Sequence, residues 1–458
     1  MENDLKKLKF FLETYQYNFY YYSISGAFNY YFNPFQNEEI VRKKLEQYPE
    51  EIQILFSFLL LGEAVQKNQK YPNINEILLI TEKLGVSIND GDKYKMNNLC
   101  LIAYNNYFFF VDIPYYYSNS NSKDTNVYIG MDTYRLTNIL PKIKKKQILD
   151  LCSGSGIQGI VCSSTNKVTF VEYNSNTIPI LQLNLKLNDI ESGEIICSDL
   201  FENVSENYDL IVSNPPFIPV PSDLDYPLAG NGGEDGLLIL DRIISGLDSH
   251  LRNNGSCILI GECLGNTHTN TLLEKTVRNR LSKGYTVNLF LNSEEPALIY
   301  ADKLSQLYKR IKSCSYSHEK LKSMWNSICD KFNANAYYSF TLFIQKKEKN
   351  DLSDFRIINN FSMWNDCVIP SIKPYITISP VEGEDLYQII AQNRKVTYID
   401  KAIYEIINRV NGVSNFWDIL PLKNLDAKMY QYILNSFEQF YSLGLIEKKV
   451  VNNGKQQL

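Results

Sequence analysis

The feature that most constrains this chain is an alternation of short apolar runs with helical stretches, which begins near residue 147. The runs have the length of strands, and the stretches between them have the apolar spacing of helices. This order predicts a parallel sheet covered by helices on both faces. Two later runs, 285–292 and 336–345, are candidate closing strands. The alternating segments are 148–152, 157–163, 168–173, 177–187, 194–198, 208–213, 237–247 and 256–262.

Smaller, mainly helical modules are expected on both sides of this α/β core. Before it, helical patterns lead into a hairpin that turns at Asn105 and Asn106. After it, an irregular stretch at 355–380 leads into three short helices and a strand. Helices joined to a hairpin or strand favour a winged-helix-like module at each end. The expected segments are 5–22, 38–48, 50–66, 73–84 and 100–113 before the core, and 398–410, 416–420, 427–443 and 445–450 after it.

Three domains follow from this pattern. Residues 1–120 form an N-terminal cap, 121–350 the α/β domain and 351–458 a C-terminal module. A charged stretch at 304–331 predicts a helical insertion in the α/β domain. The polar segment 118–126 is typical of a surface linker.

Composition excludes several classes of protein. The 46 basic and 51 acidic side chains give a net charge of −5, which disfavours a nucleic-acid partner because such binders carry clustered positive charge. The nine cysteines and three histidines have no ligand spacing, so we expect reduced thiols, no metal and a cytoplasmic protein. The longest apolar run, 54–61, is far short of the roughly 20 residues that span a membrane. The N-terminus lacks a signal-peptide layout.

A glycine-containing turn follows the first strand of the core. The strand ends around Asp150, and Cys152, Gly154 and Gly156 lead into the next helix. Glycine is suited to a turn that a ligand approaches closely, because it has no Cβ. An ordinary strand-to-helix turn would also fit. The next strand ends in Glu172, 22 residues after Asp150, where a carboxylate can accept hydrogen bonds from both hydroxyls of a ribose.

The acid in this turn indicates which nucleoside it binds. A dinucleotide site needs three glycines and a helix N-terminus for the pyrophosphate. Asp150 would instead repel a pyrophosphate and attract a cationic ligand, which favours S-adenosylmethionine. After the following strand, Asp199 can accept a hydrogen bond from an adenine amino group, with Leu200 and Phe201 against the ring.

The most specific motif is Asn214-Pro215-Pro216-Phe217, which follows the strand at 208–213. Asn214 offers a side-chain carbonyl, and Pro215 offers a backbone carbonyl on a stiff residue. Together these carbonyls can accept both hydrogens of a planar NH₂ group and direct its lone pair at a methyl donor. Phe217 can stack on a flat substrate.

With these motifs in place, residues 128–300 resemble a class I S-adenosylmethionine-dependent methyltransferase of the small-domain type. The Asn-Pro-Pro-aromatic motif is similar to that of release-factor glutamine methyltransferases and of adenine or guanine amino methyltransferases. Gly232-Gly-Glu-Asp-Gly-Leu237 resembles a stretch typical of the glutamine enzymes. The segment 128–136 resembles the one that lies over the cofactor. Cys152 departs from the family's first glycine, and Phe217 stands where the glutamine enzymes commonly carry tyrosine.

The resemblance implies an α/β fold with a Rossmann-like, seven-stranded core and S-adenosylmethionine as cofactor. It implies N-methylation of an amide or amino nitrogen on a peptide, protein or natural-product intermediate. A nucleic-acid amino methyltransferase acting on an extruded base stays open, as does a non-catalytic binding protein that retained the fold. The implied catalytic residues are Asn214, Pro215 and Phe217, and the implied cofactor-binding residues are Tyr128, Asp150, Cys152, Gly154, Gly156, Glu172, Asp199, Leu200 and Asn214.

Overall fold

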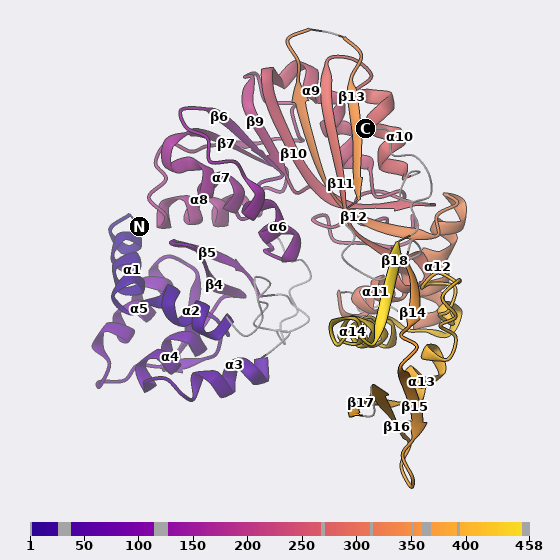
Figure 1. The fold of residues 1–458 in the computed structure, drawn as a ribbon. Coiled ribbons are helices and arrows are strands. Elements are labelled where there is room, and N and C mark those ends of the chain that lie inside the picture. The colour runs from indigo at the N-terminus through magenta and orange to yellow at the C-terminus, as the bar shows by residue number, and fades with distance from the viewer. Residues whose placement is uncertain are drawn as a thin grey trace.

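The centre of the computed structural model is an eight-stranded sheet (Figure 1). Its strand order is β13-β11-β12-β10-β9-β6-β7-β8. Neighbouring strands from β8 to β10 run parallel, and β12 runs antiparallel between β10 and β11. The strands are β6 (Gln147–Leu151), β7 (Lys167–Glu172), β8 (Glu194–Cys197), β9 (Tyr208–Ser213), β10 (Leu251–Gly265), β11 (Tyr285–Pro296), β12 (Ala336–Lys346) and β13 (Asp354–Asn359). The structure describes residues 2–25, 38–113, 127–266, 271–311, 315–349, 351–359, 368–391 and 394–450.

The Rossmann-like α/β core is confirmed, but the expected number of seven strands is wrong. The eighth strand, β13, pairs in parallel with β11 inside the stretch that was expected to be irregular. Only Phe355 and Ile357 of β13 pack on the core, so its alternating pattern is too short to stand out in the sequence.

Both faces of the sheet are buried, as expected for a parallel sheet. Along β6, Ile148 packs into one apolar core and Leu149 into the other. The first core includes α7 and α8, and the second includes α9 and α10. The strand order reverses between β6 and β9, which is where open α/β sheets bind ligands, beyond the carboxyl ends of the strands. The helices are α6 (Met131–Ile139), α7 (Ile157–Cys162), α8 (Ile178–Leu187), α9 (Leu238–His250) and α10 (Leu272–Arg280).

The N-terminal elements lie below one end of the sheet in Figure 1. The predicted hairpin is confirmed: β4 and β5 pair around Asn105, whose φ is +54°. The single helix expected at 5–22 is wrong, because Gln16 adopts a φ of +51° and divides it into α1 and α2. The elements are α1 (Glu2–Thr14), α2 (Tyr17–Ser25), α3 (Glu38–Leu45), α4 (Glu50–Leu59), α5 (Pro72–Lys83), β1 (Val65–Gln66), β2 (Ser87–Asp90), β3 (Lys93–Met96), β4 (Leu99–Tyr104) and β5 (Tyr107–Asp112).

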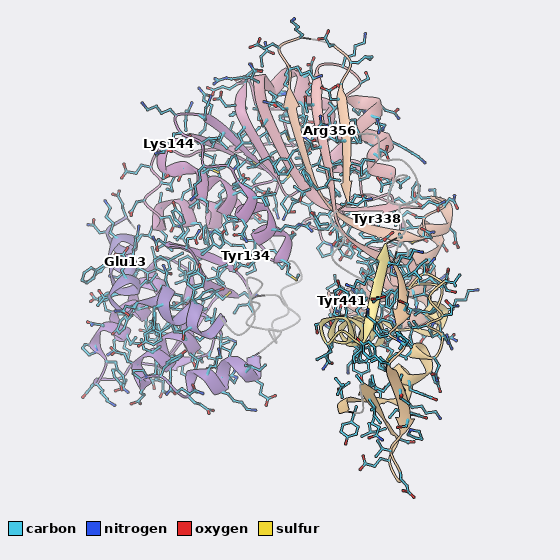
Figure 2. All side chains as sticks on the ribbon, viewed as in Figure 1. Glu13, Tyr134, Lys144, Tyr338, Arg356 and Tyr441 are labelled. Carbon is cyan, nitrogen blue, oxygen red and sulfur yellow. The ribbon has the colours of Figure 1, made fainter. Side chains whose placement is uncertain are left out.

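Asn184 on α8 and Asn188 at its C-terminal cap join the hairpin to the central α/β unit. The side chain of Asn188 accepts from the N–H of Phe108 at 2.9 Å and donates to its carbonyl at 2.7 Å. Asn184 does the same with Phe110, at 2.8 and 3.1 Å. Tyr134 lies on α6 (Figure 2). Its ring stacks on that of Tyr104 in the hairpin.

The predicted helical insertion near 304–331 is a pair of helices, α11 (Ala297–Ile311) and α12 (His318–Lys331). The C-terminal elements include more strands than expected. The helix expected at 398–410 starts only at Lys401, because β17 extends to Asp400, and the helix expected at 416–420 is a turn. These elements are β14 (Val368–Ile372), β15 (Ile376–Pro380), β16 (Leu386–Ala391), β17 (Arg394–Asp400), α13 (Lys401–Ile407), α14 (Ala427–Ser442) and β18 (Ile446–Val450).

A buried carboxylate connects α11 to the C-terminal elements. Asp302, which is 2% exposed, accepts a hydrogen bond from the backbone N–H of Ala427 at 2.9 Å. His318 Nε2 lies 2.8 Å from its carboxylate and Lys322 Nζ lies 3.4 Å from it. Burial opposes ionisation of Asp302, but these donors and the positive charge outweigh it and lower its pKa.

The boundaries at 120 and 350 and the linker 118–126 lie outside the described residues. The three-domain division and the winged-helix-like modules therefore stay predictions. Within the described part of the chain, no helix has the length and apolar character needed to cross a membrane.

Candidate active site

A cavity of about 540 Å³ opens at the carboxyl ends of β6, β7 and β9. This volume lies within the usual range for small-molecule sites. Leu307 of α11 and the loop around Tyr226 line it as well. Two predicted cofactor-binding residues, Asp150 and Gly156, lie outside this lining. The predicted residues that line the cavity are Tyr128, Cys152, Gly154, Glu172, Asp199, Leu200, Asn214, Pro215 and Phe217.

The turn after β6 has a left-handed backbone at three of the predicted positions. Cys152, in place of the family's glycine, has a φ of +59°, a conformation that is rare for a residue with a side chain. Gly154 has a φ of +52°, and a Cβ there would meet no atom within 4 Å. Open space beside Gly154 leaves the backbone free to contact a ligand. Gly156 serves packing, because a Cβ there would lie 2.4 Å from Leu181.

Asp150 is buried beneath the turn and does not line the cavity. Its side chain is 1% exposed and accepts a hydrogen bond from the backbone N–H of Gly159 at 2.9 Å. Burial raises the pKa of Asp150 to about 8, against the opposing effect of that hydrogen bond. The expected attraction between Asp150 and a cationic ligand therefore finds no support, and Asp150 instead ties β6 to α7.

Glu172 lies at the tip of β7, as predicted. Its two carboxylate oxygens accept the backbone N–H groups of Gly154, at 2.9 Å, and Asn174, at 2.8 Å. Burial raises the pKa of Glu172 above its ordinary value despite these hydrogen bonds. The carboxylate thus fixes the glycine turn and faces the cavity at the same time.

Asp199 is paired with a residue that the motifs did not reveal. Arg242, on α9, lies 3.0 Å from the Asp199 carboxylate and also lines the cavity. Arg242 follows shortly after the 232–237 motif, but no pattern in the sequence marks it as part of a site. The ion pair holds the Asp199 carboxylate in place in the cavity lining.

Asn214 extends from the end of β9 and makes one side-chain hydrogen bond. Its Nδ2 donates to Asp132 Oδ2, on α6, at 2.6 Å. Its Oδ1 is buried and accepts no hydrogen bond from the residues that the structure describes. A buried acceptor without a donor is costly, and its position in the cavity lining indicates a place for a ligand donor.

The glycines of the segment 232–236 pack directly on the backbone of Phe217. A Cβ on Gly232 would lie 2.8 Å from the Phe217 Cα, and one on Gly236 would lie 2.5 Å from the Phe217 carbonyl oxygen. Gly236 also has a φ of +76°. Backbone hydrogen bonds between Ile218 and both Gly230 and Gly232 hold the two segments together. The glycine segment therefore holds the Asn-Pro-Pro-Phe turn in place by packing against its backbone.

Residues 130–286 match the family model described as the methyltransferase small domain. This stretch of the chain is similar to a methyltransferase small domain. The matched residues belong to the central α/β unit, which also includes the antiparallel strand β12 between β10 and β11.

The methyltransferase domain is similar to several curated proteins. A protein of Methanocaldococcus jannaschii assigned as a protein N5-glutamine methyltransferase is 35% identical over 130 residues, which are 27% of this chain and 66% of that protein. The ribosomal protein uL3 glutamine methyltransferase of Francisella tularensis is 35% identical over 24% of this chain and 40% of its own length. The release factor glutamine methyltransferase of Mycolicibacterium smegmatis is 28% identical over 24% of this chain and 43% of its own length.

This chain thus spans less than two thirds of the length of each of these relatives. Among solved structures, the tRNA m1G37 methyltransferase of Methanocaldococcus jannaschii aligns with 56% of this chain and 59% of its own. Its sequence identity is 17% and its TM-score is 0.31.

The cavity of the methyltransferase domain carries an excess of acidic groups. Among the described residues that line it, the carboxylates are Asp132, Glu172 and Asp199, and the single basic side chain is Arg242, which is paired with Asp199. Such a lining suits a cationic ligand and disfavours a phosphate.

Proposed function

We propose that this protein is an S-adenosylmethionine-dependent N-methyltransferase that modifies an amide or amino nitrogen of a protein or peptide. The observation that carries the proposal is the buried side-chain carbonyl of Asn214, a residue of the cavity lining, which accepts no hydrogen bond from the described residues. A planar NH₂ group of an acceptor would supply the missing donor.

The lining also fits the cofactor. The open space at Gly154 suits a closely bound nucleoside, and the Glu172 carboxylate suits two ribose hydroxyls. Asp199 and Leu200, which also line the cavity, would hold the adenine ring. When bound, S-adenosylmethionine supplies a methyl group that is activated by a positively charged sulfur. The acidic lining complements that charge.

The protein's own contribution to the reaction is orientation and exclusion of water. The carbonyls of Asn214 and Pro215 would accept the two hydrogens of the acceptor nitrogen and stabilise positive charge that develops there. Phe217 would stack on the acceptor group. No described side chain has to remove a proton before the methyl group is transferred.

Two observations favour a protein acceptor over a nucleic acid. The relatives named above are glutamine methyltransferases of proteins, and two are named for ribosomal protein uL3 and release factors. The cavity presents three carboxylates and no unpaired cation among its described residues, which would repel a phosphate backbone. The relatives named for a ribosomal protein and for release factors support the expected cytoplasmic location.

The test is to incubate the purified full chain with methyl-labelled S-adenosylmethionine and, in separate reactions, ribosomal protein uL3, a release factor, total ribosomal protein and total tRNA. We expect label in a protein fraction, with one added methyl group on a side-chain nitrogen by peptide mass spectrometry. Label confined to tRNA would overturn the protein acceptor. Failure to bind S-adenosylhomocysteine in calorimetry would overturn the enzyme assignment altogether.

A further inference from the structure

Asp132 is the second residue of α6 and lines the cavity together with Asn214, which follows β9. Its carboxylate oxygen Oδ2 is 2.6 Å from Nδ2 of Asn214. The two residues are 82 positions apart in the sequence. The fold alone brings them together, and neither the glycine turn nor the Asn-Pro-Pro-Phe motif points to Asp132.

In the hydrogen bond between Asn214 and Asp132, the amide must be the donor because the partner is a carboxylate. An asparagine amide can rotate by half a turn and exchange its carbonyl for its NH₂ group at little cost. An ionised carboxylate only accepts hydrogen bonds, so it faces the NH₂ group of Asn214 and never its carbonyl. Consequently Oδ1 of Asn214, which receives no hydrogen bond from the described residues, is held in one orientation.

We propose that Asp132 is a positioning residue that locks the Asn214 carbonyl toward the methyl-transfer point. This inference rests on the proposed function, because the locked carbonyl is the acceptor for the nitrogen to be methylated. Asp132 acts through Asn214 and does not itself need to touch the acceptor. The amide variant Asp132→Asn keeps the shape but can either donate or accept, so both orientations of Asn214 become available.

The first experiment measures binding and needs no acceptor. Sinefungin carries an amino group on carbon where S-adenosylmethionine carries its methylated sulfur, and S-adenosylhomocysteine carries nothing there. Calorimetry on the full-length protein compares the two ligands with the wild type, Asp132→Asn and Asp132→Glu. We expect Asp132→Asn to weaken the affinity for sinefungin about 10-fold, the size of effect typical of a charge-assisted hydrogen bond. The affinity for S-adenosylhomocysteine should stay within about 2-fold of the wild type.

Removal of a negative charge would also weaken an ammonium ligand, and a double-mutant cycle separates the two effects. In an Asn214→Ala background the orientation effect is absent, so Asp132→Asn should then change the sinefungin affinity far less. Equal losses in both backgrounds would overturn the positioning role in favour of a plain charge effect. Equal weakening of both ligands by Asp132→Asn would also overturn it. Asp223→Asn, an exposed aspartate outside the lining, is the matched control.

The kinetic arm uses whichever acceptor the labelling experiment identifies. Asp132→Asn should lower kcat about 100-fold with little change in the KM for the cofactor, since misplacement of a reacting group by about 1 Å has an effect of this size. An unchanged kcat overturns the inference. If the wild type methylates nothing but the selective loss of sinefungin affinity is still present, the proposed function fails and the orientation of Asn214 by Asp132 stands.

Discussion

At the end of β9, the side chain of Asn214 has two halves with different environments. The NH₂ half is paired with Asp132, and the carbonyl half is buried without a donor from the described residues. The cost of that arrangement is of the order of 1–3 kcal/mol when no ligand is present. Free energy of this kind becomes available for binding when a ligand supplies the donor.

Asn214→Ala is therefore expected to reduce the rate of methyl transfer by about 100-fold or more, because the carbonyl that stabilises positive charge on the acceptor nitrogen is removed. Affinity for S-adenosylhomocysteine should stay within a few-fold of the wild type. Labelled-methyl transfer and calorimetry provide the two readings. Asn207→Ala, an exposed asparagine at the other end of β9, is the control and should change neither. Normal transfer by Asn214→Ala would refute its catalytic assignment.

Glu172 gives a prediction about pH. Burial raises its pKa, so the carboxylate takes up a proton at a higher pH than an ordinary glutamate does. We expect affinity for S-adenosylhomocysteine to fall as the pH is lowered through this raised pKa, because a protonated carboxyl is a poorer acceptor for ribose hydroxyls. The sign for folding is opposite: burial favours the protonated form, so the contribution of Glu172 to stability decreases as the pH rises.

Glu172→Gln should bind S-adenosylhomocysteine about 10-fold more weakly than the wild type at neutral pH, with a flatter pH profile. Titration calorimetry at several pH values measures both properties. Parallel pH profiles for the two proteins would show that another group is responsible and would remove the ribose assignment.

Among the elements, the glycine segment at 232–236 explains why the turn at Phe217 keeps its shape. Gly236→Ala places a Cβ against the Phe217 carbonyl and also strains a left-handed backbone. Gly85→Ala is a close control, since Gly85 has a φ of +74° and open space around its Cβ. We expect both variants to lose about 1 kcal/mol of stability through backbone strain, with a further loss for Gly236→Ala.

Gly236→Ala should in addition reduce methyl transfer, because the turn that carries Phe217 has to move. Denaturant unfolding and the labelled-methyl assay measure the two effects. If Gly236→Ala behaves like Gly85→Ala in both assays, the segment has no role in shaping the site.

At the level of elements, the sequence predicted most of what a regular pattern can reveal. The α/β core and the hairpin at Asn105 follow from apolar runs that alternate strongly with turn residues. The break at Gln16 and the strand β17 were not predictable, because tertiary contacts there override a weak local preference. The same limit applies to the site: Cys152, Glu172 and Asn214 stand out in contiguous motifs, whereas the contacts that Asp132 and Arg242 make depend on partners far away in the sequence or in other elements.

In the whole molecule, Asp302 connects α11 to the C-terminal elements. Asp302→Ala leaves the N–H of Ala427 and the side chains of His318 and Lys322 without their shared acceptor. We expect a loss of about 1–3 kcal/mol of stability and faster proteolysis of the C-terminal elements. Asp330→Ala, an exposed aspartate on α12, should have neither effect.

The contribution of Asp302 should also depend on pH. Its folded-state pKa is lowered, so its stabilising effect is complete above the ordinary pKa of 3.8 and is lost as the pH falls through the lowered value. The difference in unfolding free energy between the wild type and Asp302→Ala should therefore shrink in acid. A difference that stays constant with pH would contradict the ionised arrangement.

The contacts between α8 and β5 have a consequence for how this protein behaves at high concentration. The exposed edge of a strand is a template on which a second chain can add its own strand, and such edges promote aggregation. Asn184 and Asn188 occupy the N–H and carbonyl groups of Phe110 and Phe108 with amides that mimic a neighbouring peptide backbone. The α8 segment thereby covers the edge of β5, so that a second chain cannot pair with this strand, and no further strand is needed in the hairpin.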